Sequence, residues 1–138
     1  MSLEIALIII DFGLVVLIWM VQLLIYPSFK HYTEKNLYIW HKKYTKLMSI
    51  IVLPLMASQL IISLIILIKS VSIMLIIHFT LVCLTWLSTM LFFVPLHNKI
   101  PNRKTSENTL CDLHILNWLR TALWSVAFII SILVLNKS

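Results

Sequence analysis

Four long apolar stretches dominate this 138-residue chain. They cover about residues 3–26, 47–68, 71–96 and 113–135. The hydrocarbon core of a bilayer is about 30 Å thick and a helix crosses it with ~20 apolar residues, so each stretch is long enough to span a membrane. A membrane β-barrel would instead show segments of ~10 residues with alternating polarity. The sequence therefore predicts an all-α fold, a four-helix transmembrane bundle that forms a single integral membrane domain over residues 1–138.

The composition excludes a water-soluble globular protein. Hydrophobic residues make up 61% of the chain and charged residues 12%, whereas soluble domains have about 45–50% and 25%. The single glycine leaves no Gly-rich phosphate loop, and two cysteines, Cys83 and Cys111, do not form a disulfide framework. The basic residues lie next to the predicted spans without a nucleic-acid-binding motif, so we expect no nucleic-acid partner.

The positions of the basic residues predict the orientation. Eight of them follow the first and third stretches: Lys30, Lys35, Lys42, Lys43, Lys46, Lys99, Arg103 and Lys104. The opposite side has only Lys69 and Lys137. By the positive-inside rule the two long connections face the cytoplasm and both termini face out, an N-out/C-out arrangement. We therefore expect a multi-pass protein of the bacterial inner membrane, with the lipid bilayer as its partner.

The segment before the second stretch has its own pattern. Aromatic and apolar side chains alternate with lysines over residues 36–46: Leu37, Tyr38, Trp40 and Tyr44. This indicates an amphipathic helix that either lies at the membrane interface or extends the second span inward. Pro27 is expected to end the first helix, and Pro54 to kink the second.

Polar residues within or beside apolar stretches carry a desolvation cost, so their positions indicate function. The densest set maps to the cytoplasmic boundary, and its histidines come from three segments: His31, His41, His97 and His114. Imidazole is the commonest metal ligand and bundles build cofactor sites from facing helices, so His41, His97 and His114 form a candidate metal site. With His31 they are the candidate cofactor ligands, for a metal ion or a haem. The alternative is an interfacial belt of histidine, tryptophan and tyrosine without a chemical role.

Arg120 lies about two turns inside the fourth stretch, near Asn117. Charges at this depth usually face the interior of a bundle or a cavity. Arg120 is therefore a candidate for binding an anionic group such as a carboxylate, a phosphate or a haem propionate. Asn117 would help to orient that group, and Tyr44 completes the candidate catalytic set. The alternative is that Arg120 extends its side chain to the cytoplasmic interface.

A third set lies deeper in the predicted membrane. Asp11, Gln59 and His78 come from three different stretches and reach similar depths. A carboxylate can pair with an imidazole there and favour its charged form, as in proton relays. The alternative is a structural hydrogen-bonded pair that determines how the spans pack.

Short motifs with polar and aromatic residues follow one another along the chain. They are Trp19-Met-Val-Gln22 with Tyr26-Pro27-Ser28-Phe29, Trp40-His41-x-x-Tyr44-Thr45, Pro54-Leu-Met56 with Gln59, Thr89 with Pro95-Leu-His97-Asn98, and Asn117-Trp118-Leu-Arg120-Thr121 with Trp124. In this order they resemble an uncharacterised family of small bacterial integral membrane proteins with four spans, over nearly the whole chain. The last two motifs are similar to those of the DUF1772, anthrone-oxygenase-like membrane proteins, over the last third of the chain. The second resemblance implies oxidative chemistry on an aromatic or quinone-like substrate, and neither assigns a catalytic residue.

Three classes of function fit these observations. The first, which we favour because polar residues from several segments share one depth, is a metal- or haem-binding oxidoreductase or oxygenase-like protein that acts on a lipid-soluble aromatic or quinone-like molecule. The second is a small proton-coupled carrier that uses the deeper set as a relay. The third is a non-catalytic accessory or assembly subunit of a homo-oligomer or a larger membrane complex.

Overall fold

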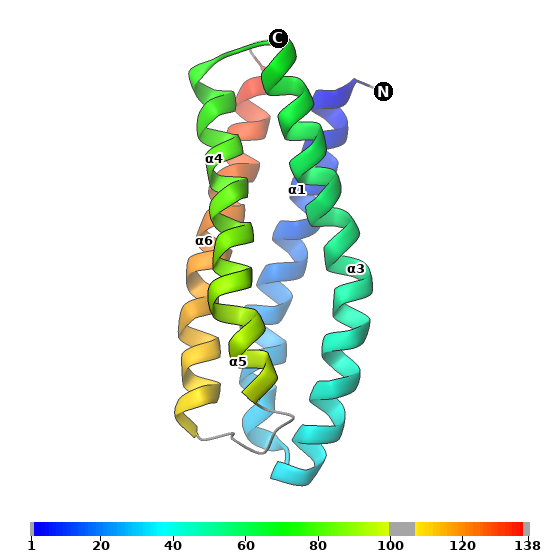
Figure 1. Cartoon of the computed structure of the whole chain (residues 1–138), viewed down its shortest axis with the longest axis vertical. Helices are drawn as coiled ribbons and strands as arrows, with labels where there is room; N and C mark the ends of the chain where they lie inside the picture. The colour runs from blue at the N-terminus through cyan, green and yellow to red at the C-terminus, as the bar shows by residue number, and fades with distance from the viewer. Residues whose placement is uncertain (1, 100–106, 137–138) are drawn as a thin grey trace.

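The computed structural model describes residues 2–99 and 107–136. The first helical segment contains α1 (Leu3–Met20) and continues through a π-helical turn, η1 (Val21–Ile25), into the short α2 (Tyr26–Ser28) and η2 (Phe29–His31). The second is the single long helix α3 (Glu34–Lys69). Together these two segments bring the chain to the far end of the bundle and back (Figure 1).

The second half of the chain repeats this arrangement. Helix α4 (Ile73–Ser88) continues through a second π-helical turn, η3 (Thr89–Phe93), into α5 (Val94–Lys99), and α6 (Glu107–Leu135) returns. All four segments are long and apolar enough to cross a membrane. The predicted all-α four-helix bundle is therefore confirmed, and the chain is a multi-pass membrane protein.

The helices form a four-sided bundle. α1 packs against α3 and α6, and α4 packs against the same two helices. Both termini lie at one end of the bundle, which also holds the tight turn between α3 and α4 (Figure 1). We call the other end the basic end, because exposed lysines gather there: Lys30, Lys35, Lys42, Lys43 and Lys46. The predicted sidedness, with this end in the cytoplasm, rests on the positive-inside rule.

Proline shapes two of the segments in the same way. Pro27 does not end the first helix, as the sequence predicted, because helical structure continues to His31. A proline lacks an N–H and its ring crowds the carbonyl four residues earlier. The preceding turn widens instead: the N–H of Tyr26 reaches the carbonyl of Val21, and before Pro95 the N–H of Val94 reaches that of Thr89. Each proline thus follows a π-helical turn, which rotates the side chains on either side of it relative to one another.

The amphipathic segment before the second span is part of α3. With 36 residues this helix is about 54 Å long at ~1.5 Å per residue, well beyond the ~30 Å of the hydrocarbon core. The segment thus extends the span at the basic end, which was one of the two arrangements predicted. Pro54 lies inside α3 on an exposed side, and the helix continues on both sides of it.

Two clusters of buried apolar side chains fill the bundle. The larger one lies in the half toward the basic end and includes Phe29, Phe93 and Trp124. The smaller one, which includes Leu7 and Ile66, lies toward the termini. Apolar residues also cover most of the outer surface, as expected where the solvent is lipid.

Candidate functional site

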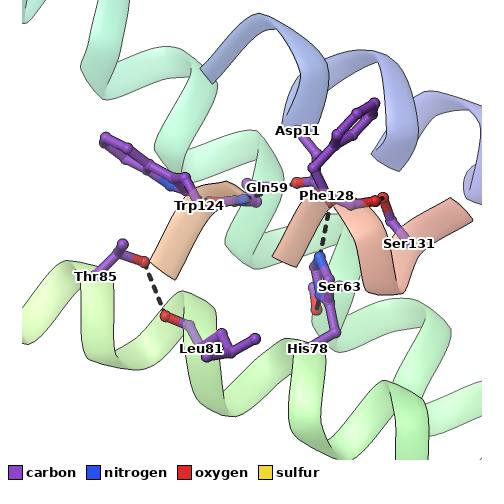
Figure 2. A network of polar contacts seen from close by, with 9 residues as sticks. All are labelled: Asp11, Gln59, Ser63, His78, Leu81, Thr85, Trp124, Phe128 and Ser131. Atoms are coloured by element: carbon purple, nitrogen blue, oxygen red, sulfur yellow. Dashed lines mark hydrogen bonds and ion pairs between the residues drawn. The ribbon is translucent and has the colours of Figure 1, made fainter. Parts of the chain in front are cut away.

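A fully buried polar network joins all four long helices in the middle of the bundle (Figure 2). The carboxylate of Asp11 on α1 receives a hydrogen bond at each oxygen: Gln59 Nε2 of α3 donates to Oδ1 at 2.7 Å, and His78 Nε2 of α4 lies 2.8 Å from Oδ2. On the other side of the imidazole, Ser63 Oγ lies 2.9 Å from His78 Nδ1. Trp124 of α6 donates from Nε1 to Gln59 Oε1 at 3.3 Å.

The spacing of these residues explains the network. Gln59 and Ser63 are four residues apart and therefore lie on one face of α3. Asp11 and His78 come from the two helices that flank α3. The structure thus brings together the three residues that the sequence grouped by depth, and adds Ser63 and Trp124. Every polar atom that faces the network has a partner, as buried polar groups in lipid require.

Ser63, His78 and Asp11 are the three residue types of a hydrolytic triad. All three side chains are sealed from the surface, and none lines the cavity described below. A substrate has no route to the serine hydroxyl. The hydrogen bonds of the network link α1, α3 and α4.

A second polar group lies nearer the basic end and consists of three hydrogen-bonded rings. His41 Nε2 of α3 lies 2.8 Å from His97 Nδ1 of α5, and His97 Nε2 lies 3.1 Å from the hydroxyl of Tyr26 on α2. His41 is fully buried, and the ring of Phe29 packs edge-on against it at 5.8 Å. Within the described residues, Nδ1 of His41 has no hydrogen-bond partner.

Gln22 and Asn117 bridge the first and last helical segments beside these rings. Asn117 Nδ2 donates to Gln22 Oε1 at 2.8 Å, and Gln22 Nε2 donates to the main-chain carbonyl of His114 at 3.3 Å. Both amide side chains are fully buried. The π-helical turn η1 positions Gln22 for this contact. Asn117, a predicted site residue, thus holds the helices in place at this level and leaves its Oδ1 without a partner among the described residues.

A cavity of about 390 Å³ lies between these groups and the lipid. Its walls come from α1 and η1 on one side, α3 on the second, and η3 and α5 on the third, with Tyr26, Tyr44, His97 and Arg120 as its main polar residues. Ser49 and Leu53 of α3 and Met90 and Val94 of the opposite wall line it and are also exposed on the outer surface. The mouth therefore opens sideways, toward the lipid, between α3 and the segment from η3 to α5.

Arg120 enters this cavity from α6 with an exposed fraction of only 8%. Its guanidinium carbon lies 4.4 Å from the ring centre of Phe93 and 4.9 Å from that of Trp124. Within the described part of the chain, Nε has no hydrogen-bond partner and the guanidinium forms no ion pair with a carboxylate. Arg120 therefore faces the interior of the bundle, which was one of the two arrangements expected from the sequence. Two aromatic rings cover its guanidinium.

The four histidines that the sequence placed at one depth do not gather at one point. His41 and His97 are in contact, whereas His31 is exposed on η2 and His114 is half-buried on α6. In residues 2–99 and 107–136 no group of three or more histidine, cysteine, aspartate or glutamate side chains could hold a metal ion. A metal or haem site built from His41, His97 and His114 thus gains no support from the geometry.

Sequence reasoning missed two residues of the sites. Ser63 is a polar residue one turn beyond Gln59 on the same face of α3, so its part in the network could have been predicted from the sequence. Phe93 is the last residue of the π-helical turn before Pro95 and its ring lies over Arg120, and a single sequence gives no signal for this contact. Trp124, which belongs to the last of the sequence motifs, joins Arg120 to the buried network.

Comparisons with known proteins leave the site to be interpreted on its geometry. No protein-family model, no curated protein and no solved structure matches this chain.

Proposed function

We propose that this chain is a protein of the bacterial inner membrane that binds a lipid-soluble, amphipathic molecule with an anionic head group. The head group binds Arg120, and the apolar part occupies the cavity between α3 and the segment from η3 to α5. The single observation that carries this proposal is the buried guanidinium of Arg120, which has no ion-pair partner among the described residues and lies at the wall of a cavity open to lipid.

The energetics of Arg120 favour an anionic ligand. A buried charge without a counter-ion is costly, and the attraction between a cation and two aromatic rings offsets only part of that cost, about 0.5–2 kcal/mol for each ring. An anion in the cavity would replace the water that the guanidinium has lost. Arginine is suited to this task because its N–H groups bind carboxylate, phosphate or sulfate oxygens in pairs.

The two aromatic rings also restrict the direction of approach. Phe93 and Trp124 lie over the guanidinium of Arg120, so the edge with its N–H donors remains for the ligand. A planar carboxylate or one edge of a sulfate fits such a site. Tyr44 lines the cavity and makes no hydrogen bond within the described residues, so its hydroxyl is a further donor for the head group.

The size of the cavity limits the ligand. A volume of 390 Å³ is at the lower end of the ~300–1,000 Å³ range of small-molecule sites. One acyl chain or one small ring system fits, whereas the two chains of a phospholipid do not. The hydroxyl hydrogens of Thr45 and Ser49 at the mouth are already donated to main-chain carbonyls, so this part of the wall is nearly apolar toward the ligand.

Binding of model amphiphiles tests the proposal. The protein is placed in nanodiscs of a neutral phospholipid and titrated with decyl sulfate, decanol and decyltrimethylammonium in a calorimeter, with empty nanodiscs as the blank. We expect saturable binding of decyl sulfate at one site per chain. Arg120→Gln should weaken it by about 10- to 150-fold, because a hydrogen bond to a charged group contributes about 1.5–3 kcal/mol.

The matched control is Lys43→Gln, which removes one positive charge at the basic end from a residue outside the cavity. This variant should bind decyl sulfate as the wild type does. If Arg120→Gln and Lys43→Gln reduce binding equally, attraction to the membrane surface explains the binding and the proposed site is wrong.

A further inference from the structure

The three hydrogen-bonded rings lead from the cavity into the protein. Tyr26 and His97 both line the cavity, while His41 lies behind His97 and does not. Their contacts of 3.1 and 2.8 Å form an unbroken chain from the Tyr26 hydroxyl to His41. This series of hydrogen bonds ends at Nδ1 of His41, a buried nitrogen without a partner among the described residues.

The hydrogen bonds between these three rings can be donated in either of two directions. Each neutral imidazole has one N–H donor and one acceptor nitrogen, and a hydroxyl can donate or accept. If Tyr26 donates to His97, every proton of the chain points inward, and His41 Nδ1 carries a buried N–H with nothing to receive it. If Tyr26 donates into the cavity, His97 donates to Tyr26, His41 donates to His97, and His41 Nδ1 is an unfilled acceptor.

An anion in the cavity favours the second direction. Bound at Arg120, it can accept a hydrogen bond from Tyr26, and this leaves His41 Nδ1 as the free basic atom of the chain. Within the part of the chain that the structure describes, the charged and titratable groups around the two imidazoles are Tyr26 on α2, Tyr44 on α3 and Arg120 on α6. Arg120 is the only permanent charge among these, and it opposes protonation of the histidines until an anion neutralises it.

Resting on the proposed function, we infer that the site is proton-coupled: binding of an anionic head group at Arg120 is accompanied by uptake of a proton at His41 Nδ1 of the His41–His97 pair. An amphiphile that arrives through the lipid as the neutral carboxylic acid would break its O–H bond on binding. In exchange a proton is taken up at His41 Nδ1, so the net change is one O–H bond broken on the acid and one N–H bond formed on His41. A ligand that is always ionised takes the proton from the buffer. The substrate class is therefore a membrane-soluble weak acid.

Calorimetry in buffers of different ionisation enthalpy tests this, because the observed heat changes with the buffer in proportion to the protons taken up. Decyl sulfate is the decisive probe, since it stays ionised and any proton uptake must occur on the protein. At about pH 7.5, above the ordinary range of histidine titration, we expect close to one proton taken up per decyl sulfate bound to the wild type. Decanol should cause none.

Variants locate the proton. His41→Gln should abolish the uptake while decyl sulfate still binds, because the position lies outside the cavity wall and an amide side chain cannot be protonated. His97→Gln should also abolish it. His31→Gln removes an exposed histidine outside the chain of rings and should leave the uptake at the wild-type value.

Binding and proton uptake are read separately, so the two proposals can fail separately. Saturable binding that depends on Arg120 without proton uptake would overturn the coupling and leave the binding site standing. Uptake that persists in both His41→Gln and His97→Gln would also overturn it. Binding that does not depend on Arg120 would overturn the proposed function instead.

Discussion

Replacing Asp11 by alanine tests the role of the buried network. The carboxylate is 1% exposed and accepts from Gln59 Nε2 at 2.7 Å and from His78 Nε2 at 2.8 Å. Asp11→Ala would leave both of these buried donors without an acceptor. Each unsatisfied donor costs about 1–3 kcal/mol, which gives about 2–6 kcal/mol for the pair.

For a protein in a membrane we expect a loss of stability in the lower half of this range. Hydrogen bonds between membrane helices contribute about 0.6 kcal/mol on average in measured cases, because the unfolded state in the membrane also finds partners. We therefore expect Asp11→Ala to lower the free energy of unfolding by about 2–4 kcal/mol. Asp11→Asn keeps an oxygen acceptor for Gln59 and should cost less than half as much.

The assay is unfolding in mixed micelles with increasing sodium dodecyl sulfate, followed by tryptophan fluorescence. Glu4→Ala provides the matched control, since it removes the other acidic residue of α1 outside the network, and we expect a change below about 0.5 kcal/mol. A double-mutant cycle with His78→Ala should give an interaction free energy of at least about 1 kcal/mol. If Asp11→Ala unfolds within about 0.5 kcal/mol of the wild type, the network does not stabilise the bundle and the reasoning fails.

Three further predictions concern the cavity and the orientation. Phe93→Leu removes one of the two rings over Arg120 and should lower stability by about 0.5–2 kcal/mol in the same unfolding assay; an unchanged stability would show that this contact contributes nothing. Val52→Trp places a large ring in the cavity wall and should weaken decyl sulfate binding by more than about tenfold with a stability change near ~1 kcal/mol; unweakened binding would place the ligand elsewhere. In a variant with Cys83 and Cys111 replaced by serine, a cysteine introduced in place of Ser2 should react with an impermeant maleimide added outside intact cells, and one in place of Lys43 only after lysis; the reverse pattern would contradict the N-out orientation.

The fold follows from the sequence because its dominant signal is local. An apolar run longer than ~20 residues specifies a spanning helix regardless of what it packs against, and the short link between Lys69 and Ile73 makes α3 and α4 adjacent. The local effect of Pro27 and Pro95 on the helices was harder to predict. A proline predicts either an end, a kink or a widened turn, and the choice of a π-helical turn depends on how the following residues pack.

The depth of the site residues in the membrane could be predicted from the sequence, but the direction of their side chains around each helix could not. Asp11, Gln59 and His78 could be grouped because each interrupts a long apolar run at a comparable height, and the structure brings them into contact. The same reasoning grouped His31 and His114 with the His41–His97 pair, although height does not say which way a side chain points. His31 is exposed and His114 is half-buried, so neither joins the pair. The direction of a side chain around its helix depends on packing between helices, and a single sequence does not specify it.

The most direct test of the proposed binding site at Arg120 is to locate a bound amphiphile on the protein. A fatty acid with a diazirine near the middle of its chain is added to membranes that contain the protein, activated by light, and mapped by mass spectrometry. We expect crosslinks at cavity residues such as Met48, Val52 and Met90, competition by decanoate, and loss of these crosslinks in Arg120→Gln but not in Lys43→Gln. Crosslinks spread evenly over the lipid-facing sides of α4 and α6, or unchanged in Arg120→Gln, would contradict a binding site for an anionic amphiphile at Arg120.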